Sequence, residues 1–255
     1  MMKANNNNNL SVSLIGLGSM GSALAGTLID KGFKITIWNR DLNKAQPLIH
    51  KGAELASSAA EAIAASPVTI MCVSNYNVST VILAQEGVTE ALENKTFIQL
   101  STGTPKEARD MEALISSKGV AYLDGSILAW PSHISGEETT ILVSGKKPVF
   151  ENIEPIMKAL AGNLIPMGEA IGGASSLFAA VLAYLAGQWI GFCHGALICE
   201  TEGLDVEGFG ALMNKLSPVL GAELEHMGKV IAHDEFYKPK SQTFHFPPST
   251  FMVML

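Results

Sequence analysis

Cysteine is scarce in this chain of 255 residues, and basic residues are fewer than acidic ones, 17 against 24. The three cysteines, Cys72, Cys193 and Cys199, are an odd number and each stands in an apolar run. This pattern excludes a disulfide framework and predicts reduced, buried thiols in a cytoplasmic protein. The net charge of −7 argues against a nucleic-acid surface. The six histidines show no metal-ligand spacing, so we expect no metal site.

The first nine residues lack the apolar stretch of a secretory signal. They hold one lysine and five consecutive asparagines. A signal peptide would instead carry a continuous apolar region followed by small residues. We therefore expect residues 1–9 to form a disordered lead-in and the first domain to begin at residue 10.

A glycine-rich string follows the first apolar run of the chain. Residues 10–15 are typical of a buried strand, and they lead into the sequence GLGSMG at 16–21. In a dinucleotide-binding fingerprint the first glycine permits the tight turn, the second lets the backbone approach the pyrophosphate, and the third lets the helix pack closely. The position between a strand and a helix favours this interpretation over an ordinary glycine-rich turn. We expect the cofactor to contact Gly16, Leu17, Gly18, Ser19 and Met20.

The second strand-like segment, residues 35–38, ends in Asn39 and Arg40. An acidic residue at this position would accept hydrogen bonds from the ribose 2′-hydroxyl of NAD and repel a 2′-phosphate. Asn39 carries no charge, and the guanidinium of Arg40 suits a phosphate. The position therefore favours NADP(H), although a surface turn at residues 39–41 would account for the same residues taken alone.

Strand-like and helix-like segments alternate through the first two thirds of the chain. This alternation predicts an α/β fold with a doubly wound parallel sheet, a Rossmann domain over residues 10–167, followed by a long interdomain helix and a small all-α domain within residues 168–255. Expected strands lie at 68–73, 97–100, 120–123, 140–143 and 163–166, and expected helices at 59–65, 108–117 and 149–160. Residues 42–50 form an amphipathic stretch.

Residues 170–199 lack Asp, Glu, Lys and Arg altogether. By length and apolarity this segment could span a bilayer. Acidic rather than basic residues flank it, which disfavours a membrane span. Small residues recur at every fourth position, so one helix face would admit a close neighbour. These small residues are Ala179, Ala183, Gly187, Gly191 and Gly195. We expect a helix that is buried on all sides between the nucleotide domain and a partner subunit, and we keep a membrane span as the alternative.

Several further strings add to the glycine motif. They are residues 72–74 (CVS), 101–105 (STGTP) and 124–127 (DGSI), with Pro131 and Ser132 beyond. With these strings the chain resembles the β-hydroxyacid dehydrogenase superfamily, which is 6-phosphogluconate dehydrogenase-like, and most closely its imine reductase and reductive aminase branch. The resemblance extends to about Tyr237, and the DGSI string with Pro131 points to the imine branch.

The resemblance implies NADPH-dependent hydride delivery to the C=N bond of a small-molecule imine, or to the product of an amine and a carbonyl. It implies a homodimer with interlocked helical domains, and neither nucleic acid nor a membrane as partner. Besides the residues already given, it implies cofactor contacts at Val73, Ser74, Val78, Ser101, Ile127 and Ala129.

The long helix lacks the lysine with which the hydroxyacid branch moves a hydroxyl proton. An iminium is already protonated, so its reduction needs orientation more than a resident acid. Many imine reductases place Asp or Tyr where Ala179 stands here. The catalytic candidates are Tyr184, Ser101 and Thr102. Tyr184 is alternatively a core tyrosine. Because Thr104 can cap the next helix, Ser101 and Thr102 are free to orient the substrate. Trp130 is either a wall of the substrate pocket or a packed core residue.

A helix is expected at 220–233, after which the sequence is irregular. The resemblance implies further helices beyond Tyr237, so we expect a helical domain that is shortened at its C-terminus. Two alternatives to imine reduction stay open. One is a β-hydroxyacid dehydrogenase or aldehyde reductase, which the superfamily fold suggests. The other is a non-catalytic NADPH-binding protein, which Ala179 and the short C-terminus suggest.

Overall fold

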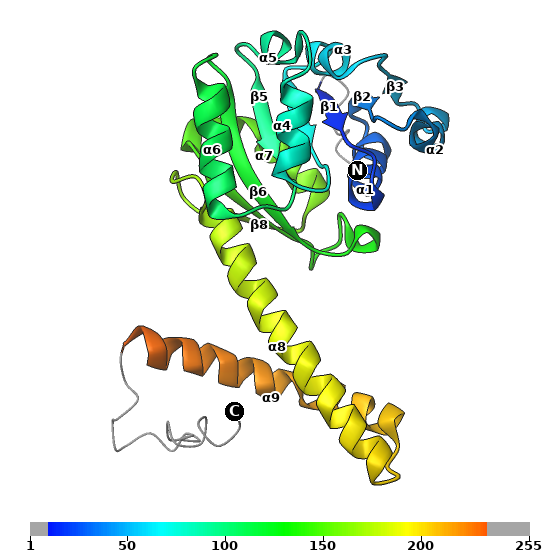
Figure 1. The fold of residues 1–255 in the computed structure, drawn as a ribbon, viewed down its shortest axis with the longest axis vertical. Coiled ribbons are helices and arrows are strands. Elements are labelled where there is room, and N and C mark those ends of the chain that lie inside the picture. The colour runs from blue at the N-terminus through cyan, green and yellow to red at the C-terminus, as the bar shows by residue number, and fades with distance from the viewer. Residues whose placement is uncertain (1–9, 234–255) are drawn as a thin grey trace, which may run out of the picture. The chain divides into compact units, whose positions relative to one another are not determined.

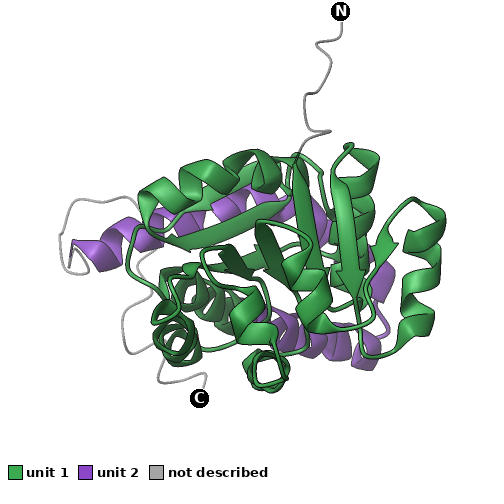
Figure 2. Ribbon diagram, turned by 90° about the horizontal axis from the view of Figure 1, so that it is seen from above, with its two compact units in different colours: residues 1–184 green, residues 185–255 purple. Residues whose placement is uncertain are grey.

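The computed structural model describes residues 10–233. The chain divides into two compact units after Tyr184 (Figure 2). The first unit holds the sheet, its covering helices and the first turns of a long helix, and the second holds the rest of that helix and the one that follows. The expected lead-in at 1–9 and the irregular segment after residue 233 lie outside the described residues.

Within the described residues the first unit is built on an eight-stranded sheet in the order β3-β2-β1-β4-β5-β6-β7-β8 (Figure 1). All neighbouring strands pair in parallel except β6 and β7. The predicted fold class is confirmed, with one correction to the all-parallel sheet. The link between β6 and β7 holds only a single 3-10 turn, η3 (Pro131–His133), and a link without a crossover helix returns the chain antiparallel. The strands are β1 Ser11–Ile15, β2 Lys34–Trp38, β3 Glu54–Leu55, β4 Val68–Met71, β5 Thr96–Gln99, β6 Ala121–Leu128, β7 Thr140–Gly145 and β8 Asn163–Pro166.

Helices cover both faces of this sheet. Neighbouring residues of one strand enter different hydrophobic clusters: Leu14 of β1 belongs to one cluster and Ile15 to the other. Side chains alternate across a strand, so the two clusters lie on opposite faces. The first cluster contains residues of α1, α2 and α7, and the second contains residues of α3, α4, α5 and α6. These helices are α1 Ser19–Asp30, α2 Gln46–His50 after the 3-10 turn η2 Leu42–Ala45, α3 Ala59–Ala64, α4 Tyr76–Leu83, α5 Val88–Ala91, α6 Pro105–Ser116 and α7 Lys147–Leu160.

Most predicted elements are confirmed, and the exceptions have local causes. Strand β6 continues to Leu128, beyond the predicted end at 123, because its antiparallel partner β7 pairs along that extension. Helix α9 (Val206–Ala232) begins well before the predicted residue 220. Its first half contains two glycines and Pro218, which weaken a helical pattern in sequence. Asp205 caps it by accepting a hydrogen bond from the Glu207 N–H at 3.0 Å. The prediction missed β3, α4 and α5.

The long helix is α8 (Gly173–Thr201), and it is long and apolar enough to cross a membrane by length and composition. The expected burial of α8 between the nucleotide domain and a partner subunit stays a prediction, because the structure describes a single chain. Only Ala174 and Ser175 are buried along its length. For the same reason Cys193 is exposed and Cys199 half-buried, against the expectation of three buried thiols. Cys72 is buried as expected, and its burial raises the pKa of that thiol to about 12.

Candidate active site

The strand order places a topological switch point between β1 and β4, where open α/β sheets form a ligand-binding crevice. Strand β1 leads into α1 on one face of the sheet, and β4 leads into α4 on the other. The loops after these two adjacent strands therefore diverge at their carboxyl ends, which is where open α/β sheets bind ligands. The glycine string follows β1, and Val73 and Ser74 follow β4.

The glycine loop is packed on its inner side and open on its outer side. Gly16 has a φ of +99°, and a Cβ there would overlap the Cys72 carbonyl and the Val73 side chain. A Cβ at Gly21 would overlap the Gly16 carbonyl oxygen, so α1 packs directly on the turn. At Gly18, by contrast, a Cβ would meet nothing within 4 Å. The glycines thus serve the roles predicted for Gly16 and Gly21, and Gly18 leaves space above the backbone.

The N-terminus of helix α1 has the features of an anion-binding site. Its N-cap is Gly18, which offers no side-chain hydrogen bond, and its first turn has no acidic residue. The N–H groups of Ser19 and Met20 lie in the first turn, where the helix offers them no carbonyl acceptor, and the helix dipole favours negative charge at this end. A diphosphate fits this arrangement. Leu17 is buried and Ser19 is exposed.

Asn39 and Arg40 follow β2, and their side chains differ in their contacts. The Asn39 Oδ1 accepts the Leu17 N–H at 2.9 Å, and its Nδ2 donates to the Asp41 carbonyl oxygen at 2.8 Å. The Asn39 side chain therefore holds the glycine loop to the end of β2. The side chain of Arg40 is exposed and makes no hydrogen bond or ion pair with any residue between 10 and 233. Its guanidinium is available for an anion.

The loops after β4 and β5 are tied to each other. The Val73 N–H donates to the Ser101 Oγ at 2.9 Å, and Ser101 is 4% exposed. Asn75 caps α4 by accepting the Val78 N–H at 3.0 Å, and Val78 is 37% exposed. The Ser101 hydroxyl thus has a structural task in the loop, whereas Thr102 is exposed.

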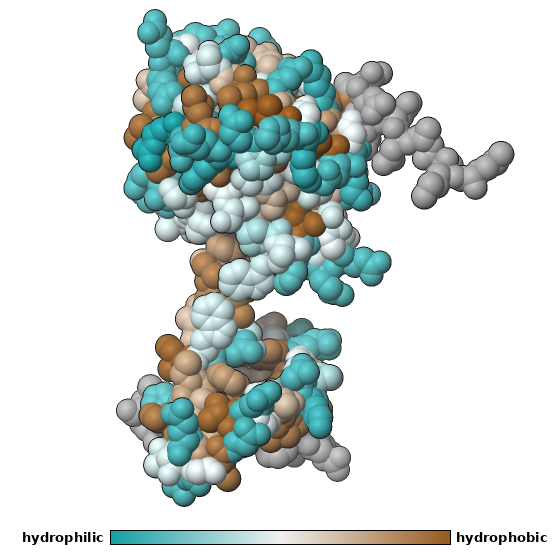
Figure 3. Space-filling model, turned by 90° about the vertical axis from the view of Figure 1, so that its right-hand side faces the viewer, coloured by the Kyte–Doolittle hydropathy of each residue, from teal (hydrophilic) through white to brown (hydrophobic). Residues whose placement is uncertain are grey.

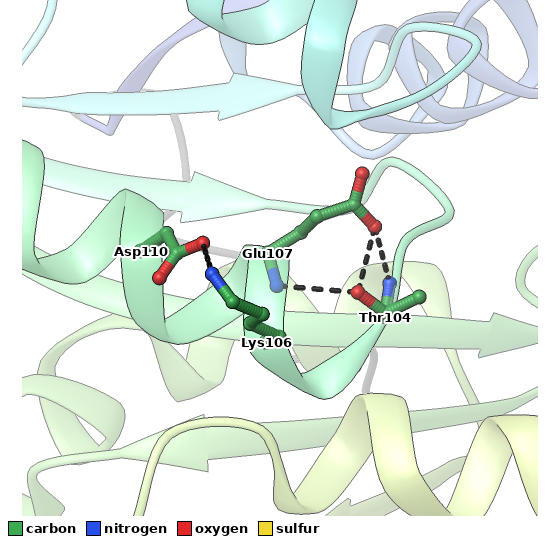
Figure 4. A network of polar contacts seen from close by, with 4 residues as sticks. All are labelled: Thr104, Lys106, Glu107 and Asp110. Carbon is green, nitrogen blue, oxygen red and sulfur yellow. Dashed lines mark hydrogen bonds and ion pairs between the residues drawn. The ribbon is translucent and has the colours of Figure 1, made fainter.

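A capping box begins α6, as Figure 4 shows. The Glu107 N–H donates to the Thr104 Oγ1 at 3.2 Å, and the Thr104 N–H donates to the Glu107 Oε2 at 2.8 Å. Lys106 and Asp110 form an exposed ion pair beside it at 2.6 Å. The predicted capping role of Thr104 is confirmed, so Thr102 is not needed for the cap.

The extension of β6 carries Ile127 and Ala129 past the carboxyl end of β5. Gln99, the last residue of β5, pairs with Asp124, so residues 125–128 project beyond it. Ile127 and Ala129 pack against the same cluster as Met20, and η3 contacts α1. Trp130 is 63% exposed, which rules out the core alternative for it.

The sequence analysis did not assign a role to Asp124, which is fully buried at the centre of a hydrogen-bond network. Its Oδ1 accepts the Tyr76 hydroxyl at 2.5 Å, and its Oδ2 accepts the Ser175 hydroxyl at 2.8 Å. Burial raises the pKa of Asp124, and the two hydroxyl donors oppose this rise. Burial also raises the pKa of Tyr76. An acidic residue inside an apolar strand was the signal available in the sequence.

The one catalytic candidate on α8, Tyr184, lies away from the buried start of the helix. Tyr184 is 47% exposed, so it is not a core tyrosine of the described chain. It lies eleven residues after Gly173, or about 16 Å along the helix axis at the usual rise per residue. No group of three or more His, Cys, Asp or Glu residues that could hold a metal occurs among residues 10–233.

Comparison with known proteins agrees with this geometry. Residues 11–168 match the family described as the NAD binding domain of 6-phosphogluconate dehydrogenase. The chain is 34% identical over 221 residues to the NADPH-dependent reductive aminase of Aspergillus oryzae, covering 86% of this chain and 74% of that protein.

Two solved structures are similar over most of their length. The imine reductase from Myxococcus stipitatus in complex with NADP⁺ has a TM-score of 0.85 at 31% identity, over 91% of this chain and 81% of that one. The reductive aminase from Aspergillus terreus in complex with NADPH and ethyl-5-oxohexanoate has a TM-score of 0.81 at 32% identity, over 92% and 80%. The chain belongs to the imine reductase and reductive aminase branch of the 6-phosphogluconate dehydrogenase-like superfamily.

Proposed function

We propose that this protein is an NADPH-dependent oxidoreductase that delivers hydride to the carbon of an imine or iminium. The observation that carries the proposal is the 34% identity to a reductive aminase over 86% of the chain, combined with an α8 that contains no lysine. Oxidation of a hydroxyacid requires a group that takes the hydroxyl proton, and the helix offers no lysine for it. An iminium already carries its proton.

The residues of the crevice fit NADPH, which supplies the hydride when bound. The N–H groups at the start of α1 would hold the diphosphate, and Gly18 leaves the space for it. Arg40 would bind the 2′-phosphate, because its guanidinium is exposed and has no described partner. Asn39 would act indirectly by fixing the glycine loop. The proposed contacts nearer the nicotinamide are Val73, Ser74, Val78, Ile127 and Ala129.

On the substrate side of the site, the residues are proposed to orient the imine for hydride transfer. Thr102 is exposed at the carboxyl end of β5 and could donate a hydrogen bond to the substrate. Ser101 supports the loop through the Val73 N–H, and its own proton remains available as a donor. Tyr184 is the proposed donor to the substrate nitrogen, and Trp130 a candidate wall for an apolar substrate.

A second copy of this chain is the proposed partner. Large apolar side chains are exposed along α8 and α9, among them Ile190 at 64%, Ile198 at 62% and Val219 at 64% (Figure 3). Gly187 and Gly191 have no atom within 4 Å of a Cβ position, whereas Gly195 is covered by Phe209 of α9. Monomeric proteins rarely expose contiguous apolar surface of this kind. A homodimer that packs these helices together would bury it.

The experiment is NADPH oxidation by the purified protein with cyclic imines and with amine and ketone pairs, alongside oxidation of small β-hydroxyacids with NADP⁺. Turnover of imines alone supports the proposal. Turnover of hydroxyacids alone would replace it with a dehydrogenase. Tight NADPH binding without hydride transfer to any substrate would make the protein a non-catalytic cofactor binder. Light scattering in the same buffer tests the dimer, and a monomer would contradict it.

A further inference from the structure

One buried carboxylate joins the two helices that begin at the candidate site. Asp124 pairs with Gln99, the last residue of β5, so it lies level with the carboxyl edge of the parallel strands. Its two oxygens are divided between two elements: Oδ1 accepts from Tyr76 of α4, and Oδ2 accepts from Ser175 of α8. Asp124 is fully buried and Ser175 and Tyr76 are each 2% exposed, so water does not compete for these bonds.

On one side the network fixes the loops that flank the proposed nicotinamide contacts. Tyr76 is the first residue of α4 and directly follows its N-cap, Asn75. Its ring lies against Gly103, where a Cβ would come within 2.5 Å of the Tyr76 Cε2. The Tyr76 side chain therefore touches the loop after β5 while its backbone belongs to the segment after β4. Holding its hydroxyl holds both loops.

On the other side the network fixes the start of α8. Ser175 lies in the first turn, and the preceding Ala174 N–H donates to the Ser144 Oγ of β7 at 2.8 Å. The N–H groups of Gly172 and Ser175 also face the Asp124 carboxylate. The Asp124 carboxylate thus lies at the start of α8, where the helix dipole favours negative charge. The bond between the Ser175 hydroxyl and Asp124 therefore ties the first turn of α8 to β6.

We propose that Asp124 is a positioning residue that aligns the cofactor-side start of α4 with the substrate-side start of α8. The inference rests on the proposed function, because it assigns NADPH to the α4 side and the imine to the α8 side. It predicts that the two hydroxyls on the same carboxylate control different kinetic parameters. A carboxylate that merely stabilises the fold would give both variants the same phenotype.

The test compares Tyr76→Phe and Ser175→Ala, each of which deletes one hydroxyl from Asp124. Loss of one buried hydrogen bond corresponds to about a threefold to tenfold change in a binding constant. We expect Tyr76→Phe to raise the Kd for NADPH by this factor and the KM for the imine by less, because the Tyr76 ring also touches Gly103 in the loop that carries Thr102. We expect Ser175→Ala to raise the KM for the imine with the Kd for NADPH unchanged. Asp124→Asn should raise both.

Ser176→Ala is the matched control, because the Ser176 hydroxyl donates to the Gly172 carbonyl in the same turn and does not touch Asp124. It should change neither constant. Equal changes in the Tyr76→Phe and Ser175→Ala variants, or a loss of melting temperature with both constants intact, would overturn the proposal.

Amide hydrogen exchange supplies a readout that does not require turnover. Ser175→Ala should speed exchange at 173–177 and leave 74–79 protected, and Tyr76→Phe should do the reverse. If the wild-type protein reduces no imine, the proposed function fails, while NADPH binding and exchange still decide whether Asp124 holds both helices. If Asp124→Asn does not fold, the two single-hydroxyl variants decide. Equal exchange in both segments in either variant would contradict the division.

Discussion

Replacing Arg40 with alanine removes the guanidinium that we propose binds the 2′-phosphate at the end of β2. A charge-assisted hydrogen bond contributes about 1.5–3 kcal/mol. Arg40 is exposed, so screening by solvent favours the lower part of this range, about 1.5–2 kcal/mol. At about 1.4 kcal/mol for each factor of ten, NADPH should bind roughly 10- to 30-fold more weakly. NADH lacks the 2′-phosphate, so its affinity should not change.

The assay is titration calorimetry with NADPH and NADH on the wild type and two variants. The chain contains only two arginines, Arg40 and Arg109. Arg109 lies on α6, is exposed and makes no ion pair among the described residues, so Arg109→Ala is a matched control that should leave both affinities unchanged. The melting temperature should be unaffected in both variants. An Arg40→Ala protein that keeps its full NADPH affinity, or loses NADH affinity equally, would refute the assignment of Arg40.

Three further predictions concern the loops and the buried carboxyl. Gly16→Ala should lower the free energy of unfolding by about 2 kcal/mol, because φ is +99° at this residue. Gly18→Ala should leave the melting temperature unchanged and weaken NADPH binding, because a Cβ at Gly18 meets nothing within 4 Å. Equal melting temperatures for the two variants would contradict this prediction. Thr104→Ala should cost about 1 kcal/mol, or about 2–4 °C, and Thr104→Ser should retain the cap in thermal unfolding. Because burial raises the pKa of Asp124, its protonated form contributes stability that is present below the unfolded pKa of about 3.9 and lost as pH rises through the folded pKa. Urea unfolding from pH 4 upward should therefore show the wild type losing stability relative to Asp124→Asn, and the opposite slope would exclude a raised pKa.

The nucleotide-binding half was predictable because its signals are local. The glycine string needs only its position after a strand, and the Thr104 cap needs only Pro105 and Glu107 nearby. Each signal lies within about six residues. The structure adds that Asn39 is committed to the Leu17 N–H, which the sequence could not indicate, since the bond joins residues from different loops.

The features that sequence reasoning missed depend on distant residues or on a second chain. The Asp124 network joins residues about 50 positions apart on three elements, and no periodic pattern connects them. The direction of β7 follows from the short link before it rather than from its own residues. The apolarity of α8 correctly predicted a helix that needs burial, but a single chain covers only its first turn. The roles of Tyr184, Ser101 and Thr102 stay predictions.

The most direct measurement is isotope transfer to a cyclic imine from NADPH that carries deuterium at both C4 positions of the nicotinamide. The account predicts an amine product that carries one deuterium at the former C=N carbon, formed by the wild-type protein and formed far more slowly at subsaturating cofactor by Arg40→Ala. Mass spectrometry of the product reads this out. Saturating NADPH that yields no deuterated amine from imines or from amine and ketone pairs would contradict the central claim.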